Sequence, residues 1–196
     1  MASIARQADS NVIVSKRVFR LTKGLFTSDA ARLDIRSFLN HSSAALKNIK
    51  MGRLLMALTL LKIDGKRIAV ATAGMPPVFI FRRASRTVNE VMLKGMPLGA
   101  MKNFSYVVHE EELREGDLLL LISDGLPEQK NTAGEMFDYA RIHHVILQTP
   151  EATHETLIAA LCKAGEHWMD GTAQEDDITI IAIQFKQENP MLATHT

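Results

Sequence analysis

Acidic residues stand at the ends of two apolar runs that lie far apart in the sequence. Asp124 follows the run at residues 118–122, and Asp176 and Asp177 precede the run at residues 178–183. Both runs are too short to cross a membrane and are typical of strands buried on both faces. A carboxylate at the end of such a rigid strand is well placed to bind a metal ion or to act as an acid or base.

Two interpretations of these acids are open. The plainer one is a turn that closes a strand, because Gly125 permits a tight backbone turn after Asp124. The other is a metal site, which forms if the two strands are antiparallel neighbours and bring Asp124 and Asp176 to one edge of a sheet. Clustered carboxylates repel one another unless a cation neutralises them. Oxygen ligands suit Mg²⁺ or Mn²⁺, and the chain has no His/Cys set with zinc spacing.

The composition is that of an ordinary soluble globular protein and argues against several functions. The chain has 196 residues, which fit one domain, and 46% of them are hydrophobic. A formal net charge of +1 gives no overall field that would favour nucleic acid. We find no signal peptide and no apolar stretch of membrane-spanning length, so we expect a cytoplasmic protein without an integral membrane segment. The single cysteine, Cys162, rules out an internal disulfide and is expected to be a small core residue.

Strand patterns joined by tight turns dominate the middle of the chain. The Asp64-Gly65 pair between residues 54–63 and 66–72 predicts a β-hairpin. Further strands are expected over residues 78–81, 88–93, 105–109 and 118–122. The glutamates within residues 110–115 are expected to form a solvated turn. Such a series of strands predicts antiparallel sheets rather than alternating strand–helix–strand units.

Helical periodicity marks the two sides of this strand-rich region. A basic amphipathic helix is expected within residues 11–25, and a second helix is expected to begin at Ser28 and to continue to about residue 49. Two more helices are predicted, one over residues 135–147 and one capped by Thr149. The fold class is therefore α+β, with two packed layers of antiparallel strands whose outer faces are covered by helices.

Several segments also occur in an order that resembles the PPM-type Ser/Thr phosphatases, most closely their bacterial SpoIIE-like branch. Besides the hairpin, the segments are residues 73–77, 96–99, 116–125, 134–137 and 176–179. The resemblance covers about residues 28–186 and implies an αββα four-layer sandwich, in which two antiparallel sheets face each other and are flanked by helices. It also implies hydrolysis of phosphoserine or phosphothreonine by metal-activated water.

The resemblance further implies which residues bind metal. Aspartates at the sheet edge hold a pair of Mn²⁺ or Mg²⁺ ions in this family. Asp124 and Asp176 match two of these metal-binding aspartates. Asp177 and Gly125 stand beside them, where they are expected to orient ligands or waters or to bind the ion themselves.

The chain departs from the family pattern before the first matching helix. An acid-rich strand ending in Asp and an Asp followed by a Gly-His-Gly turn are expected upstream, and neither is found; Met75 stands where His is typical. We therefore expect an N-terminally incomplete PPM domain. Residues 1–27 would form an N-terminal segment, 28–186 the phosphatase-like domain and 187–196 a polar tail. Such a chain is not expected to hold a full binuclear centre and should be inactive or nearly so on its own.

Two functions follow as hypotheses. The first is a phosphatase that acts on a phosphorylated bacterial signalling protein, for which the resemblance suggests an anti-sigma-factor antagonist. The second is a catalytically inactive relative that binds regulatory proteins. A chance match of a generic α+β domain is disfavoured by the order of the motifs. Neither hypothesis involves nucleic acid, and the oligomeric state is left open by the sequence.

Overall fold

A computed structural model describes residues 2–7, 34–48 and 55–186 of the chain. In chain order its elements are β1 Ala2–Gln7, α2 Ile35–Asn48, β2 Leu58–Asp64, β3 Arg67–Ala73, β4 Val78–Arg82, β5 Thr87–Val91, β6 His109–Glu112, β7 Leu118–Ile122, α3 Asp138–Gln148, α4 His154–Met169 and β8 Ile178–Gln184. None of the helices in the described ranges has the length and apolar character to cross a membrane. The helix expected within residues 11–25, the Ser28 cap and the tail at 187–196 lie outside these ranges.

The strands form two sheets in which every described pairing is antiparallel. The larger sheet has the order β1-β8-β7-β4-β5, and the smaller one has the order β2-β3-β6. The predicted hairpin is confirmed, since β2 pairs with β3 from Leu58↔Ala73 to Asp64↔Arg67. Gly65 in its turn has a φ of 56°, a left-handed conformation that glycine adopts without steric cost.

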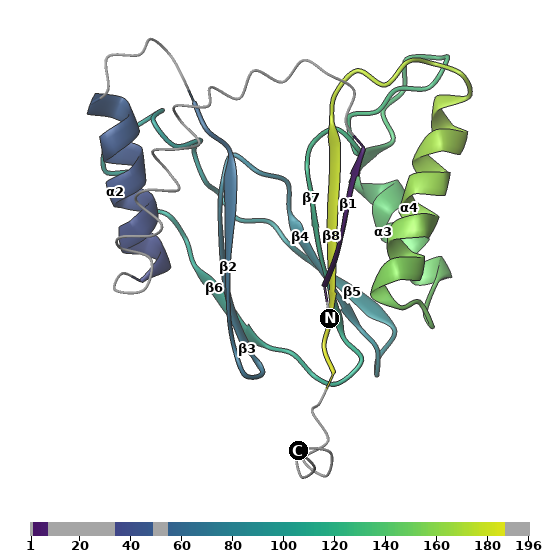
Figure 1. Ribbon diagram of the computed structural model, residues 1–196, viewed down its shortest axis with the longest axis horizontal. Helices are drawn as coiled ribbons and strands as arrows, with labels where there is room; N and C mark the ends of the chain where they lie inside the picture. Colours follow the sequence, from purple (N-terminus) through teal and green to yellow (C-terminus); the bar gives the residue numbers. More distant parts are fainter. Residues whose placement is uncertain (1, 8–33, 49–54, 187–196) are drawn as a thin grey trace, which may run out of the picture.

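The two sheets lie between helices, which gives four layers (Figure 1). Helix α2 packs on the outer face of the smaller sheet, where Phe38 and Leu39 join Ala71 and Ala73 in one buried cluster. Helices α3 and α4 cover the opposite outer face of the larger sheet. A further buried cluster lies between the sheets. The predicted α+β class and αββα sandwich are confirmed.

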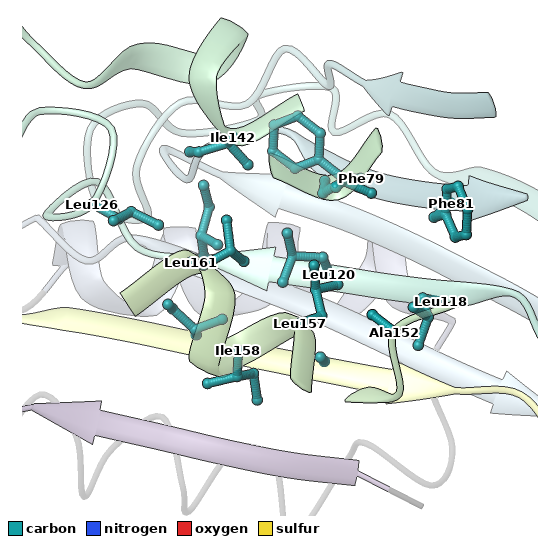
Figure 2. Packing of buried hydrophobic residues seen from close by; sticks show 14 of the residues in the cluster. Phe79, Phe81, Leu118, Leu120, Leu126, Ile142, Ala152, Leu157, Ile158 and Leu161 are labelled. Carbon is teal, nitrogen blue, oxygen red and sulfur yellow. The ribbon is translucent and has the colours of Figure 1, made fainter. Parts of the chain in front are cut away.

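Strand β7 shows why its sequence is apolar without interruption. Leu118, Leu120 and Ile122 belong to the cluster that packs against α3 and α4. Leu119 is buried in the cluster between the two sheets, and Leu121 packs against that cluster. Figure 2 shows the helix side of this core, with Leu120 close to Leu157 of α4 and Leu118 close to Ala152, which precedes that helix. Both faces of the strand are covered, so both sets of alternating side chains are apolar.

The prediction for residues 105–115 was wrong in its placement of the strand. The strand is β6, and its Glu110, Glu111 and Glu112 lie within it rather than in a solvated turn. Among the described strands, β6 pairs with β3 alone and lies at the edge of the smaller sheet. At this edge, the charged side chains of β6 can contact solvent or a basic residue while the backbone of the strand stays paired.

The predicted start of the last helix was also wrong. Helix α4 begins at His154 and not after Thr149. Thr153 is its N-cap: its hydroxyl accepts from the Thr156 backbone N–H at 3.3 Å, and the Thr156 hydroxyl accepts from the Thr153 N–H at 2.8 Å. This reciprocal pair is a capping box, which satisfies two backbone N–H groups at the start of the helix. Cys162 on α4 is half-buried against the core, as expected of a small packing residue.

Candidate metal-binding edge

The pairing of β7 with β8 brings the two acidic segments together. The strands are antiparallel, with Leu121 opposite Ile181 and Ile122 opposite Ile180. The chain leaves β7 toward Asp124 at the same edge at which it enters β8 from Asp176 and Asp177. The condition on which the sequence-based metal site depended is thus met. We call this region the acidic edge: Ser123–Gly125 together with Asp176 and Asp177.

Ser123 and Gly125 hold the two halves of the acidic edge in contact. The Ser123 hydroxyl donates to the Asp177 carbonyl at 3.1 Å and accepts from the Thr179 N–H at 2.9 Å. The Ser123 N–H donates to the Thr179 carbonyl at 2.9 Å. A Cβ atom at Gly125 would lie 2.4 Å from the Asp177 carbonyl oxygen. Gly125 therefore serves close backbone approach.

The carboxylates of the acidic edge face outward. Asp124 and Asp176 are exposed, and Asp177 is half-buried. One oxygen of Asp176 accepts from the Asp177 N–H at 2.7 Å, which fixes the start of the segment entering β8. Within the described ranges, the Asp124 carboxylate has no hydrogen bond or salt bridge. An outward-facing carboxylate that is not used internally is available to a ligand from solution.

The chemistry of these donors fits Mn²⁺ or Mg²⁺, but the described residues supply only part of a ligand set. Asp124 and Asp176 offer hard oxygen ligands, which both ions prefer. However, residues 34–48 and 55–186 contain no group of three His, Cys, Asp or Glu side chains that could hold an ion. The acidic edge therefore accounts for two carboxylate ligands and leaves the remaining coordination to other donors.

Tyr139 is close enough to Asp124 of the acidic edge to be affected by its charge, and the sequence placed it only within the helix predicted over residues 135–147. Its ring centre lies 6.4 Å from that of Phe79 on β4. Burial raises the pKa of Tyr139 above its ordinary value, and the nearby charges of Glu128, Asp124 and Glu90 raise it further. The phenol is thus held protonated beside these carboxylates. Because Glu90 lies on β5, only the tertiary fold could reveal this group.

Lys130 is a second residue near the acidic edge that no sequence pattern singles out. Its ammonium group lies 2.7 Å from the carboxylate of Glu175, the residue before Asp176. Its carbonyl accepts from the Thr172 hydroxyl at 2.7 Å. The loop after Asp124 and the segment before β8 are therefore joined through Lys130 by both backbone and side chain.

Comparison with known proteins identifies a family and two curated relatives of this chain. The family model for stage II sporulation protein E (SpoIIE) matches residues 16–186. Phosphoserine phosphatase RsbU of Bacillus subtilis is 29% identical over 72 residues, which are 37% of this chain and 22% of that protein. Protein IcfG of a Synechocystis strain is 26% identical over 124 residues, which are 63% of this chain and 19% of that protein. The chain thus spans about a fifth of the length of these curated relatives.

Solved structures agree with the fold. The SiaA-PP2C domain of Pseudomonas aeruginosa superposes with a TM-score of 0.75 at 16% identity, over 94% of this chain and 80% of that one. The PP2C phosphatase domain of SpoIIE from Bacillus subtilis, solved with a fragment of its regulatory domain, gives a TM-score of 0.72 at 20% identity. That match covers 94% of this chain and 54% of the other. At these identities the superpositions support the architecture alone.

Proposed function

This chain belongs to the SpoIIE family of PPM-type phosphatase domains, and we propose that it acts on phosphoserine or phosphothreonine of a bacterial signalling protein. The observation that carries the proposal is the antiparallel pairing of β7 and β8, which brings Asp124 and Asp176 to the same edge. A phosphatase of this class needs carboxylates gathered at one place to hold its metal. The pairing of the two strands places these carboxylates at one edge although they lie more than fifty positions apart in the sequence.

In this proposal Asp124 and Asp176 bind Mn²⁺ or Mg²⁺, and Asp177 orients the segment that carries Asp176. When bound, such an ion supplies Lewis acidity, which makes water nucleophilic near neutral pH. The chain's own contribution is positional. Ser123 ties β7 to the start of β8, and Gly125 lets the two backbones meet, so the carboxylates are held without support from flexible side chains.

The proposed partner is a phosphorylated protein in the cytoplasm. RsbU is named a phosphoserine phosphatase, and we extend that substrate class to this chain. An anti-sigma-factor antagonist is our candidate for the partner, by the same family argument. The proposed substrate class, partner and location all depend on the proposed chemistry at the acidic edge.

A second candidate function is phosphoprotein binding without hydrolysis. The observation that favours it is the lack of any three-donor group among residues 34–48 and 55–186, since two carboxylates hold a divalent ion weakly. In that case the acidic edge would be a remnant of the catalytic site, and the domain would regulate a partner by binding it.

Phosphate release from a phosphoserine peptide in Mn²⁺ separates the two candidates. Because the described ligand set is partial, we expect slow turnover that requires Mn²⁺ and falls at least tenfold in Asp124→Asn and in Asp176→Asn. Asp64→Asn is the matched control, because Asp64 is an exposed aspartate at the end of β2. Absence of Mn²⁺-dependent release from the native chain, with binding of the peptide retained, would reject hydrolysis and support the binding function.

A further inference from the structure

The segments that border the acidic edge carry an unbalanced charge. Residues 123–137 and 170–177 contain a single basic side chain, Lys130. Their acidic side chains are Asp124, Glu128, Glu135, Asp170, Glu175, Asp176 and Asp177. A phosphate monoester carries close to two negative charges at neutral pH, so it is repelled by such a border unless cations meet it. Lys130 is therefore the protein's own candidate for that role within these segments.

The backbone of Lys130 is fixed on both sides. Its carbonyl accepts from Thr172, and the residue forms an isolated antiparallel bridge with Met136. The preceding Gln129 is buried, and its carbonyl accepts from the Phe137 N–H at 2.8 Å. Because the backbone of Lys130 is already fixed, no loop has to be ordered before its ammonium group binds an anion.

The side chain of Lys130 forms an ion pair that is exposed enough to be exchanged for another anion. Its 2.7 Å pair with Glu175 leaves the lysine side chain 41% exposed and the glutamate side chain 66% exposed. Exposed pairs of this kind contribute little net stability because both groups remain solvated. Glu175 can turn into solvent, and the ammonium group is then free to accept another anion without a large energetic cost.

We infer that Lys130 is a substrate-binding residue that contacts the phosphoryl group of a phosphoserine or phosphothreonine side chain, and that Glu175 competes with the phosphate for it. Glu175 is adjacent to Asp176, so the phosphate held by Lys130 lies at the acidic edge. The inference rests on the proposed function for the identity of the bound group. It adds to that function a phosphate contact, Lys130, and a competing carboxylate, Glu175, which lowers the affinity for the phosphate.

The test is binding of a fluorescent phosphoserine peptide with uncharged flanking residues, measured by anisotropy with EDTA present. Without a divalent ion, turnover cannot remove the phosphate and the metal cannot bind it. We expect Lys130→Ala to weaken binding about tenfold, the usual scale for loss of one charge-assisted hydrogen bond. Glu175→Gln is expected to tighten binding about threefold, because it removes the competing carboxylate.

Three controls make the result specific. Lys163→Ala removes the same charge from an exposed position on α4 and should leave affinity unchanged. Lys130→Arg keeps the charge and should recover most of the binding. The same peptide with unphosphorylated serine should bind weakly to every variant. Equal affinity of native and Lys130→Ala protein for the phosphopeptide, or an equal loss in Lys163→Ala, overturns the inference.

The outcome is separable from the test of the proposed function. If no Mn²⁺-dependent turnover is found but binding depends on Lys130, hydrolysis is rejected and the phosphate contact stands. If turnover is found and Lys130→Ala leaves both KM and peptide affinity at native values, hydrolysis stands and the contact is rejected. A rise in KM with kcat unchanged is the expected signature when both are correct.

Discussion

Strand β7 is flanked by two aspartates, and the fold treats them in opposite ways. Asp117, before the strand, is 1% exposed. Its two oxygens accept from Arg82 at 2.7 Å, from the Arg83 N–H at 3.0 Å and from the Arg114 N–H at 2.9 Å. Asp124, after the strand, is exposed and has no hydrogen bond or ion pair from its carboxylate among the residues that the structure describes.

The difference separates a structural carboxylate from one available for chemistry. A buried charge is tolerated only when it is paired and hydrogen-bonded, and Asp117 meets this requirement through residues of its own chain. Arg82 also pairs with Glu111 of β6, so this end of the strand links the two sheets. Burial alone would lower the pKa of Arg82, but Asp117 and Glu111 outweigh it and raise that pKa. At the other end of β7, the carboxylate of Asp124 remains available to bind an ion from solution.

The largest expected effect tests this contrast through stability. Asp117→Ala removes a carboxylate partner of Arg82, whose side chain stays largely buried. We expect this change to lower the free energy of unfolding by about 3 kcal/mol. Asp124→Asn changes an exposed group and should stay within about 0.5 kcal/mol of native. Urea unfolding of both variants measures the difference. Comparable losses would mean that Asp124 also has a structural role and that the contrast is incorrect.

A smaller effect tests whether the Asp124 end is rigid. Gly125→Ala places a methyl group 2.4 Å from a backbone carbonyl, so the two strands must separate, at a cost of about 1–3 kcal/mol. Gly134→Ala is the control, because its site has no atom within 4 Å of the new methyl group and its φ of 79° alone should cost about 1 kcal/mol.

Unfolding free energies and Mn²⁺ titration of the two glycine variants give the comparison. We expect Gly125→Ala to lose both more stability and more metal affinity than Gly134→Ala, because it shifts Asp124 relative to Asp176. If the two variants behave alike, the close approach at Gly125 does not position the acidic edge.

Ser123 provides a still smaller test of the same end. Ser123→Ala removes the acceptor of the Thr179 N–H and the donor to Asp177, with an expected loss of about 1 kcal/mol. Hydrogen exchange at the Thr179 amide should accelerate. Ser85→Ala removes an exposed hydroxyl that forms a hydrogen bond with exposed Thr87, and it should have no measurable effect on either quantity. Unchanged exchange at Thr179 in Ser123→Ala would contradict the proposed link.

The acidic edge could be predicted because its parts are local signals. The apolar runs of β7 and β8 and the acids beside them are visible in sequence, and only their pairing had to be assumed. The buried Asp117–Arg82 pair joins residues 35 positions apart, and neither residue has a sequence pattern that reveals its partner. Lys130 and Tyr139 were missed for the same reason, since the groups that define their roles come from other segments.

The misplaced strand β6 and the misplaced start of α4 also have a physical cause in tertiary contacts. Arg83 donates to the carbonyls of Pro150 and Ala152 and holds them in the connection before α4, so the Thr149-Pro150 start signal is not used. At β6, pairing with β3 imposes an extended backbone on a run of glutamates that has little strand preference of its own. In both places a tertiary contact overrides the local signal.

The smallest expected effect reports the charge of Asp124 through Tyr139. Among the nearby carboxylates that raise the pKa of Tyr139, Glu128 acts most strongly, followed by Asp124 and then Glu90. Neutralising each should lower that pKa, in the order Glu128→Gln, Asp124→Asn, Glu90→Gln. The chain has two tyrosines, so a Tyr106→Phe background leaves Tyr139 as the single phenol in a near-ultraviolet pH titration.

The same shift fixes the sign of the stability change in alkaline solution. The folded protein keeps the Tyr139 proton at a pH where the unfolded chain has released it, so Tyr139 lowers stability as pH rises through and above about 10. Asp124→Asn should reduce this alkaline loss while leaving stability at neutral pH unchanged. If Asp124→Asn leaves the titration of Tyr139 where it was, the Asp124 carboxylate does not act on the phenol. The charge of the acidic edge would then have no effect on Tyr139 of α3.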